Sequence, residues 1–158
     1  MTVPPAERTR SMPVDAEAVF EVITDLEDLS SWLPAGVEVD CYGAHLVRLW
    51  VGGEVVERRI AVDWESLGVT WGDPHSPTYT GAVRVLRVAP GRSAVTVRLT
   101  GSAGLPPSRL DDWLVRALDE LALVAGVHAG PRGAGGRGAH RRTGPDAPRR
   151  PLEVMLDR

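Results

Sequence analysis

The chain has 158 residues, which is enough for one domain with a core of its own and too few for two domains of ordinary size. Its apolar fraction of 43% and charged fraction of 25% are those of a globular protein, and no stretch approaches the ~20 consecutive apolar residues that span a bilayer. Residues 129–158 hold seven Arg against three acidic residues, so residues 1–128 carry a net charge of −7, which argues against nucleic-acid binding by the core.

The cysteine and histidine content limits the cofactors that the chain can hold. Cys41 is the only cysteine, which excludes an internal disulfide and fits a reducing compartment. The N-terminus lacks the basic and apolar segments of a secretory signal, so we expect a cytoplasmic protein. No two histidines have ligand spacing, and the sequence has no phosphate-binding loop, dinucleotide fingerprint or serine elbow. We therefore expect no metal and no cofactor.

The first third of the chain is predicted to contain one strand and two short helices. Residues 5–14 are expected to form the strand. Asp15 stands at the N-cap position of a helix that should run to about residue 26. A second short helix is predicted over residues 26–33, because Pro34 cannot continue it.

Between residues 36 and 101 the apolar side chains alternate, which is typical of strands. Gly52 and Gly53 predict a two-residue hairpin turn. Residues 72–77 combine Gly, Asp and two Pro and are predicted to be a loop. The expected strands cover residues 37–42, 46–51, 54–64, 67–71, 79–88 and 93–100.

A long amphipathic helix is predicted after residue 107. Ser108 is its expected N-cap and Gly126 its expected left-handed end. Residues 129–151 contain almost no large apolar side chain and are expected to be disordered. We therefore divide the chain into a domain of residues 1–128 and a flexible Gly-, Pro- and Arg-rich tail of residues 129–158. One face of the helix is built to pack on a sheet through Leu110, Trp113, Leu114, Ala117, Leu118, Leu121 and Val124.

The order of one strand, two short helices, six antiparallel strands and a long helix resembles the START-like (SRPBCC, helix-grip) superfamily. The sequences PVDAEAVF at 13–20 and DLEDLSSWLP at 25–34 are similar to its first two helices. Trp71 and YTGAV at 79–83 are similar to the mid-sheet pattern of bacterial polyketide cyclase/dehydrase-like members. The resemblance covers about residues 5–127. It implies an α+β helix-grip fold, in which a curved antiparallel sheet of about seven strands surrounds the long C-terminal helix.

Such a fold has a physical reason to bind a ligand, because a strongly curved sheet and one helix leave a largely apolar cavity between them. The first hypothesis is a binder of a small hydrophobic molecule of the polyketide, lipid or isoprenoid class. The second is a polyketide aromatase/cyclase or dehydrase, which requires at least two of Arg58, Tyr79 and His45 to converge in one pocket. The third is a protein-interaction module that uses an apolar groove. The sequence shows no obvious acid–base pair on the cavity face, so binding ranks above catalysis.

Two polar side chains are candidate ligand-binding residues because they share a face with apolar strand neighbours. Arg58 shares a face with Val56 and Ile60, and if buried it needs an oxygen partner, for which a ligand is one candidate. The favoured alternative places its stem along the sheet edge and its head in water. His45 shares the face of Val47 and is a candidate donor or general base, although a solvent-facing position at the rim is favoured.

Three aromatic residues complete the candidate site. Trp71 and Tyr79 point inward by alternation, and the Tyr79 hydroxyl is a candidate partner for a ligand carbonyl. Ordinary aromatic core is the alternative for both. Trp113 lies on the apolar face of the last helix, where a core position is favoured over a ligand platform. Cys41 is expected to be a small buried hydrophobe.

Overall fold

The computed structural model of the chain describes residues 5–51, 53–102 and 105–143, and the side chains as far as residue 127. The chain divides into two compact units between Gly126 and Val127, and the first unit contains the sheet. Within the described residues, no helix is both long enough and apolar enough to cross a membrane.

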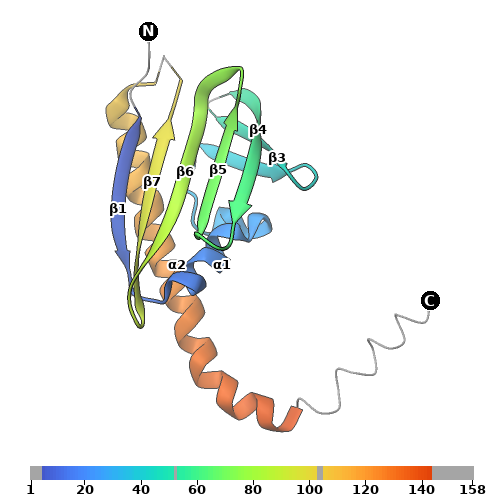
Figure 1. The fold of residues 1–158 in the computed structure, drawn as a ribbon, viewed down its shortest axis with the longest axis vertical. Helices are drawn as coiled ribbons and strands as arrows, with labels where there is room; N and C mark the ends of the chain where they lie inside the picture. The colour runs from blue at the N-terminus through green and yellow to red at the C-terminus, as the bar shows by residue number, and fades with distance from the viewer. Residues whose placement is uncertain (1–4, 52, 103–104, 144–158) are drawn as a thin grey trace, which may run out of the picture. The chain divides into compact units, whose positions relative to one another are not determined.

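A single curved antiparallel sheet dominates the first unit (Figure 1). The strand order is β1-β7-β6-β5-β4-β3-β2, so each strand from β2 to β6 pairs with the one that follows it, and β1 forms the edge beside β7. The seven antiparallel strands and the α+β class confirm the sequence prediction. The strands are β1 (Ala6–Met12), β2 (Val37–Cys41), β3 (Leu46–Val51), β4 (Glu54–Asp63), β5 (Gly68–Asp73), β6 (Ser76–Ala89) and β7 (Arg92–Thr100).

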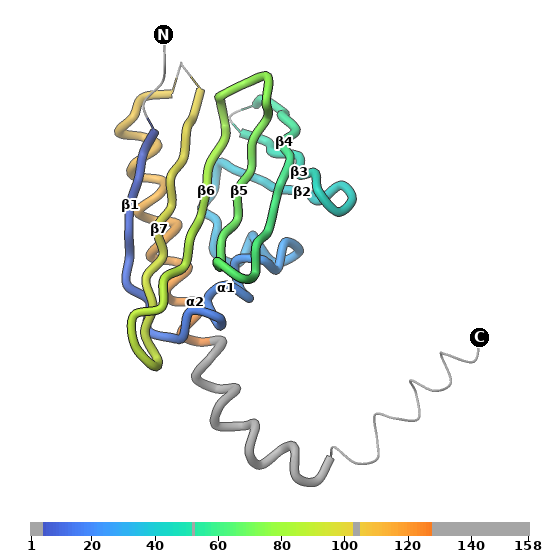
Figure 2. Tube along the Cα trace, in the orientation of Figure 1, coloured from blue at the N-terminus to red at the C-terminus, as the bar shows by residue number. Residues whose placement is uncertain are grey.

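Three helical elements accompany the sheet, in the predicted order. α1 (Ala16–Thr24) and the short 3₁₀ helix η1 (Leu26–Ser31) connect β1 to β2. α2 (Pro107–Thr143) follows β7. In Figures 1 and 2 the first part of α2 lies against one face of the sheet, behind β1, β7 and β6.

The core forms where this helix face meets the inward side of the sheet. β7 buries alternate residues, Ser93, Val95 and Val97, as expected for period-two packing. α2 buries residues three or four apart, which is the helical period. The buried α2 residues are Leu114, Ala117, Leu118, Leu121, Ala122 and Ala125. The buried side chains of the strands and of α2 thus form one continuous core.

Two ion pairs hold α2 to the edge strand β1. The Arg8 guanidinium donates to the Asp111 carboxylate over 2.5 and 2.7 Å, and Arg10 Nε donates to Asp119 over 2.8 Å. The hydrogen bond from Arg8 holds the pKa of Asp111 below its usual value. Arg8, Arg10 and Met12 lie on the same face of β1. The two arginines pair with α2 and Met12 is buried, so this face contributes both to the ion pairs and to the core.

The start of α1 differs from the expected capping arrangement. Asp15 occupies the N-cap position, but its carboxylate accepts a hydrogen bond from Gly91 N at 2.6 Å and caps no N–H of the helix. Gly91 has φ +76 in the β6–β7 turn, a conformation that favours glycine. Glu17 pairs with Arg87 at 2.6 Å. Both acidic residues therefore tie α1 to the β6–β7 hairpin.

The segment predicted as a loop over residues 72–77 is instead a tight turn. β5 extends to Asp73 and β6 begins at Ser76, and these two residues are paired. Asp73 Oδ1 accepts a hydrogen bond from His75 N at 2.8 Å, which stabilises the turn locally. The prediction was wrong because this Asp side chain lets two residues, Pro74 and His75, reverse the chain.

Both predicted ends of the long helix are also wrong. α2 begins at Pro107, a residue suited to the first helical position because it has no N–H to satisfy, so Ser108 lies inside the helix. At the other end α2 continues through Gly126 to Thr143. Gly126 does not have a positive φ, so it is not the left-handed cap that was expected. The helix overlaps the first part of the segment 129–151 for which disorder was predicted, and residues 144–158 lie outside the described residues. The division into a domain of residues 1–128 and a flexible tail stays a prediction.

Candidate functional site

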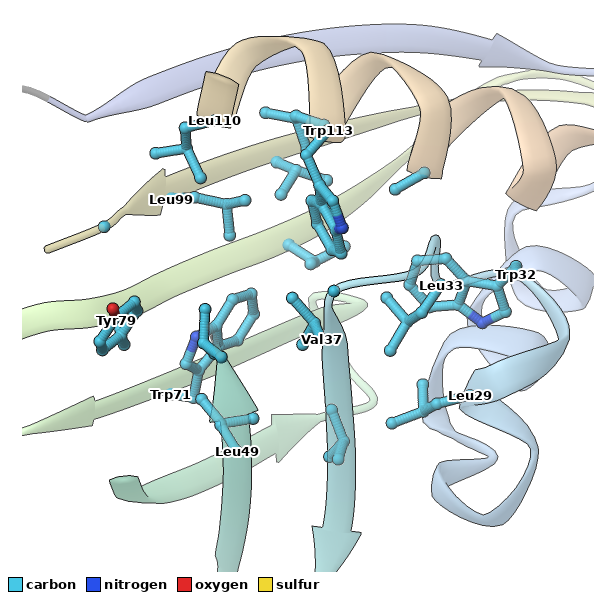
Figure 3. A pocket seen from close by; sticks show the side chains of 18 of the residues that line it. Leu29, Trp32, Leu33, Val37, Leu49, Trp71, Tyr79, Leu99, Leu110 and Trp113 are labelled. Carbon is cyan, nitrogen blue, oxygen red and sulfur yellow. The ribbon is translucent and has the colours of Figure 1, made fainter. Parts of the chain in front are cut away.

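A cavity of about 430 Å³ lies between the inward face of the sheet, η1 and α2 (Figure 3). This volume is within the range of small-molecule sites, about 300–1,000 Å³. Most of its walls are apolar. The lining includes Leu29, Leu33, Val37, Leu49, Leu99 and Leu110, which come from η1, the segment after it, β2, β3, β7 and α2.

The local sequence patterns explain why apolar side chains surround this space. In β3, Val47, Leu49 and Val51 alternate and all line the cavity. In η1 and the residues after it, Leu26, Leu29 and Leu33 recur at helical spacing on the opposite side. Since the sheet is strongly curved, one helix cannot fill the whole inward face with its side chains.

Trp71 lines the cavity from β5 and lies over a glycine of the neighbouring strand. It pairs with Gly81 of β6, where an added Cβ would come within 2.5 Å of the Trp71 ring and 2.6 Å of the Arg98 carbonyl oxygen. Contacts this short cannot be accommodated without a shift of backbone. The absence of a side chain at Gly81 therefore sets the position of the Trp71 ring in the cavity wall.

Tyr79 lines the cavity from β6 and has an uncommon backbone conformation. Its φ is +54, in the left-handed region that a non-glycine residue enters at a cost of about 1–2 kcal/mol. Figure 3 shows its ring on the same side of the cavity as Trp71. Thr80, the next residue, also lines the cavity.

Arg58 is buried, with 6% of its surface exposed, but it does not line the cavity. Its Nε and Nη2 donate to the Thr78 carbonyl oxygen at 3.0 and 2.8 Å, and its Nη1 donates to the Glu57 carbonyl oxygen at 2.6 Å. Asp73 lies 3.7 Å from Nη1. The favoured alternative, a head group in water, is wrong. The partners of this buried guanidinium are groups of the protein itself.

His45 and Cys41 also lie outside the cavity lining. His45 is exposed just before β3, and its carbonyl oxygen accepts a hydrogen bond from Ile60 N at 2.8 Å. This agrees with the solvent-facing alternative. Cys41 is exposed at the end of the edge strand β2, so the expectation of a buried hydrophobe is wrong. Val37 and Val39, on the same face of β2, line the cavity, but Cys41 lies at the end of the strand and outside the lining.

Two tryptophans beside the cavity have buried indole N–H groups without a hydrogen-bond partner. Among the described residues, Trp32 Nε1 and Trp113 Nε1 are the buried side-chain polar atoms that have no hydrogen-bond partner. Both residues line the cavity. A buried N–H without an acceptor costs about 1–3 kcal/mol. Sequence reasoning treated Trp113 mainly as core and did not single out Trp32, although Trp32 follows Leu29 at helical spacing.

The polar groups of the cavity are suited to binding rather than proton transfer. Arg109 and Arg116 of α2 line it and are exposed, so the cavity reaches the surface there. Of the three groups proposed for catalysis, only Tyr79 lines the cavity. Within the part of the chain that the structure describes, no group of three or more His, Cys, Asp or Glu could hold a metal ion. Residues with hydroxyl and guanidinium groups thus take part in the wall of an otherwise apolar space.

No protein-family model and no curated protein matches the chain. Solved structures do match. The di-domain ARO/CYC StfQ from the steffimycin biosynthetic pathway has a TM-score of 0.63 and 19% identity. The match covers 77% of this chain and 45% of that protein. The Zhui aromatase/cyclase from a Streptomyces strain has a TM-score of 0.55 and 20% identity, covering 78% of this chain and 93% of its own.

A START superfamily protein from Mycobacterium smegmatis has a TM-score of 0.53 and 16% identity, covering 75% of this chain and 91% of its own. Identities at this level establish a shared architecture and leave function to be argued from the site. The curved seven-stranded sheet, the helices after β1 and the helix α2 on the inward face are all present in this chain. The chain therefore has the START-like, polyketide-cyclase-like helix-grip fold.

Proposed function

We propose that this protein binds a small hydrophobic molecule of the polyketide, lipid or isoprenoid class. The observation that carries the proposal is the apolar cavity of about 430 Å³ between α2 and the sheet. An apolar ligand that enters it gains about 25 cal/mol for each Å² of apolar surface removed from water. The similarity to proteins named aromatase/cyclase and START superfamily protein supports the same class of ligand.

Native mass spectrometry of the protein from its natural host tests the proposal directly. We expect a retained hydrophobic molecule, which organic extraction then identifies. Purified protein that is always free of ligand, and that shows no thermal shift with a panel of polyketides, lipids and isoprenoids, would contradict the proposal.

A cavity-filling variant links the binding to this site. Val39 lines the cavity from the edge strand β2, and Val39→Trp is expected to fill part of it. If the larger ring excludes about 50 Å² of ligand surface, affinity falls about tenfold. Val55→Trp is the matched control, because Val55 is exposed on β4 and lies outside the cavity lining. Equal ligand affinities in the two variants would place the binding elsewhere.

The second candidate function is a polyketide aromatase/cyclase or dehydrase, which the names of two similar structures support. Its requirement that two of Arg58, Tyr79 and His45 converge is not met, since only Tyr79 lines the cavity. Incubation with a linear poly-ketone and analysis of products by mass spectrometry tests it. Turnover that Tyr79→Phe abolishes, with binding retained, would favour the enzyme. Tight binding without turnover would favour the binder.

The third candidate, an interaction module with an apolar groove, receives less support. Its expected signature was a large exposed apolar patch without an internal cavity. The apolar side chains from six strands and three helical elements instead converge on the cavity. A ligand small enough to enter that space is the better match.

A further inference from the structure

The charged residues of the cavity lining all have the same sign. They are Arg109 and Arg116, and no acidic residue of the described structure takes part in the lining. Residues 1–128 carry a net charge of −7, so the lining has the opposite charge to the domain that surrounds it. The acidic residues of η1, Glu27 and Asp28, lie outside the lining. Positive charge thus gathers beside apolar surface in an otherwise acidic domain.

The two arginines lie on one side of α2. They are seven residues apart, which is two helical turns or about 10 Å along the helix axis. Trp113 lies between them at helical spacing and also lines the cavity. In Figure 3, Leu110 and Trp113 project from this helix toward the strands. The two cations therefore belong to the same wall of the cavity.

Both arginines are exposed although they line the cavity. An arginine in such a position lays its apolar stem along apolar surface and keeps its charged head in water. This places the guanidinium groups at the mouth of the cavity. A carboxylate at the mouth can meet them and stay hydrated, whereas a carboxylate drawn into the apolar interior would lose its water without gaining a partner.

These cations are available to an anion. Among the described residues, neither Arg109 nor Arg116 forms an ion pair. Asp112 and Glu120 lie three or four residues from them on the same helix, but the described structure contains no ion pair of either acid. An anion at the mouth therefore has no ion pair of the protein to displace.

We propose that the ligand is an amphipathic acid, whose apolar body fills the cavity and whose carboxylate-type anion lies at the mouth beside Arg109 and Arg116. The inference rests on the proposed binding of a hydrophobic molecule and deepens it, because it names a chemical group that the ligand carries. The anion fixes which end of the ligand enters the cavity. Neutral hydrophobic molecules of the same shape are bound less well.

Pairs of probes that differ only in charge test the inference. Naphthalene-2-carboxylate and decanoate are compared with their amides, which have nearly the same shape and no charge. The Kd ratio of amide to acid is measured in the wild-type protein and in Arg109→Gln/Arg116→Gln, so that the different solubilities of the probes in water cancel. An exposed ion pair contributes up to about fivefold in affinity. We expect the preference for the acid to fall about threefold in each single variant and about tenfold in the double variant.

The matched control removes two arginines from the outward face of the sheet. Arg59 and Arg98 are exposed, form no ion pair within the described structure and lie outside the cavity lining. Arg59→Gln/Arg98→Gln therefore changes the net charge equally, and it should change the Kd ratio by less than about twofold because salt screens distant charges. Arg109→Lys/Arg116→Lys keeps both charges and should keep most of the preference for the acid.

The outcomes separate this inference from the proposed function. If acids and amides both bind, and their Kd ratio falls by less than about twofold in Arg109→Gln/Arg116→Gln, the contact with the anion is refuted while ligand binding stands. An equal fall in Arg59→Gln/Arg98→Gln, or an equal loss in the lysine variant, would also refute it. A neutral molecule retained by the protein from its natural host would overturn the inference and support the proposed function. If no probe binds and no molecule is retained, both fail.

Salt dependence gives a second measurement. Because both arginines are exposed, dissolved ions screen their attraction for a carboxylate. Raising the NaCl concentration from about 0.05 M to about 0.5 M should lower the wild-type preference for the acid relative to that of Arg109→Gln/Arg116→Gln. The same salt dependence in both proteins would contradict the proposed contact.

Discussion

At the scale of single residues, the buried Arg58 supports the wall that carries Tyr79. Its two hydrogen bonds to the Thr78 carbonyl oxygen hold the peptide unit that precedes the left-handed Tyr79. The Asp73 carboxylate nearby balances the guanidinium charge. A local strain at the cavity is thus stabilised by a charged group that does not itself reach the cavity.

Replacing Arg58 with methionine is expected to lower the free energy of unfolding by about 2–3 kcal/mol, because a buried carbonyl loses charge-assisted hydrogen bonds. Chemical denaturation measures the loss. Arg59→Met is the matched control, since Arg59 is exposed on the other face of β4 and should change stability by less than about 0.5 kcal/mol. Similar losses in both variants would show that the contacts of Arg58 contribute no special stability.

At the scale of secondary-structure elements, α2 has two different sides. One side is held to β1 by Arg8–Asp111 and Arg10–Asp119, and the other presents Trp113 to the cavity. The members of each ion pair lie more than 100 residues apart in sequence. The position of the helix on the sheet therefore depends on contacts between the first strand and the last helix.

The Arg8–Asp111 pair predicts a pH-dependent stability. The pKa of Asp111 is lower in the folded protein than in the unfolded chain, where it is about 3.9. The pair therefore stabilises the fold above that pH, and the stabilisation is lost as the pH falls through the folded pKa. Asp111→Asn should lower the thermal midpoint at neutral pH and have little effect in strong acid. Asp112→Asn, which removes no ion pair, should show no such pH dependence.

Gly126 offers a test of how α2 continues. Because Gly126 lies inside the helix and an added Cβ meets only Pro13 Cγ at 3.6 Å, Gly126→Ala should stabilise the protein by about 0.5–1 kcal/mol. Gly91→Ala is the contrasting variant. Because Gly91 has φ +76, this substitution should destabilise the protein by about 1 kcal/mol. Thermal denaturation measures both. Destabilisation by Gly126→Ala would indicate a left-handed helix end there.

At the scale of the whole molecule, the stabilising core and the cavity belong to the first unit. All buried hydrophobic residues of the described chain lie between Met12 and Ala125. The cavity lining ends at Leu121. The first unit therefore contains the apolar contacts needed for folding and for the proposed ligand binding.

We accordingly propose that residues 1–128 form an independent domain. A chain truncated after His128 should unfold within about 0.5 kcal/mol of the full chain, because it keeps every buried hydrophobic side chain that the structure describes. It should also bind the hydrophobic ligand that is retained by the full chain with the same Kd. A large drop in stability or affinity on truncation would show that residues 129–158 contribute to the domain.

The sequence predicted the inward residues best where their periodicity is strictly local. Val47, Leu49 and Ile60 are cavity residues by simple alternation, and Trp71 and Tyr79 follow the same rule. The rule failed at Cys41, which is exposed at a strand end. At Arg58 alternation gave the inward direction, but the Thr78 carbonyl that pairs with the guanidinium depends on the turn between β5 and β6. Alternation states which way a side chain points but not what it meets.

Sequence alone therefore determined the number and order of strands, the α+β class and the apolar face of α2, because these depend on periodicities within a few residues. Tertiary structure decided three further features. It paired Arg8 with Asp111, gave Arg58 the Thr78 carbonyl as its partner, and buried the Trp113 N–H without a partner. Each of these depends on the curvature of the sheet and on where α2 lies across it. Contacts between residues distant in the chain cannot be read from a local pattern.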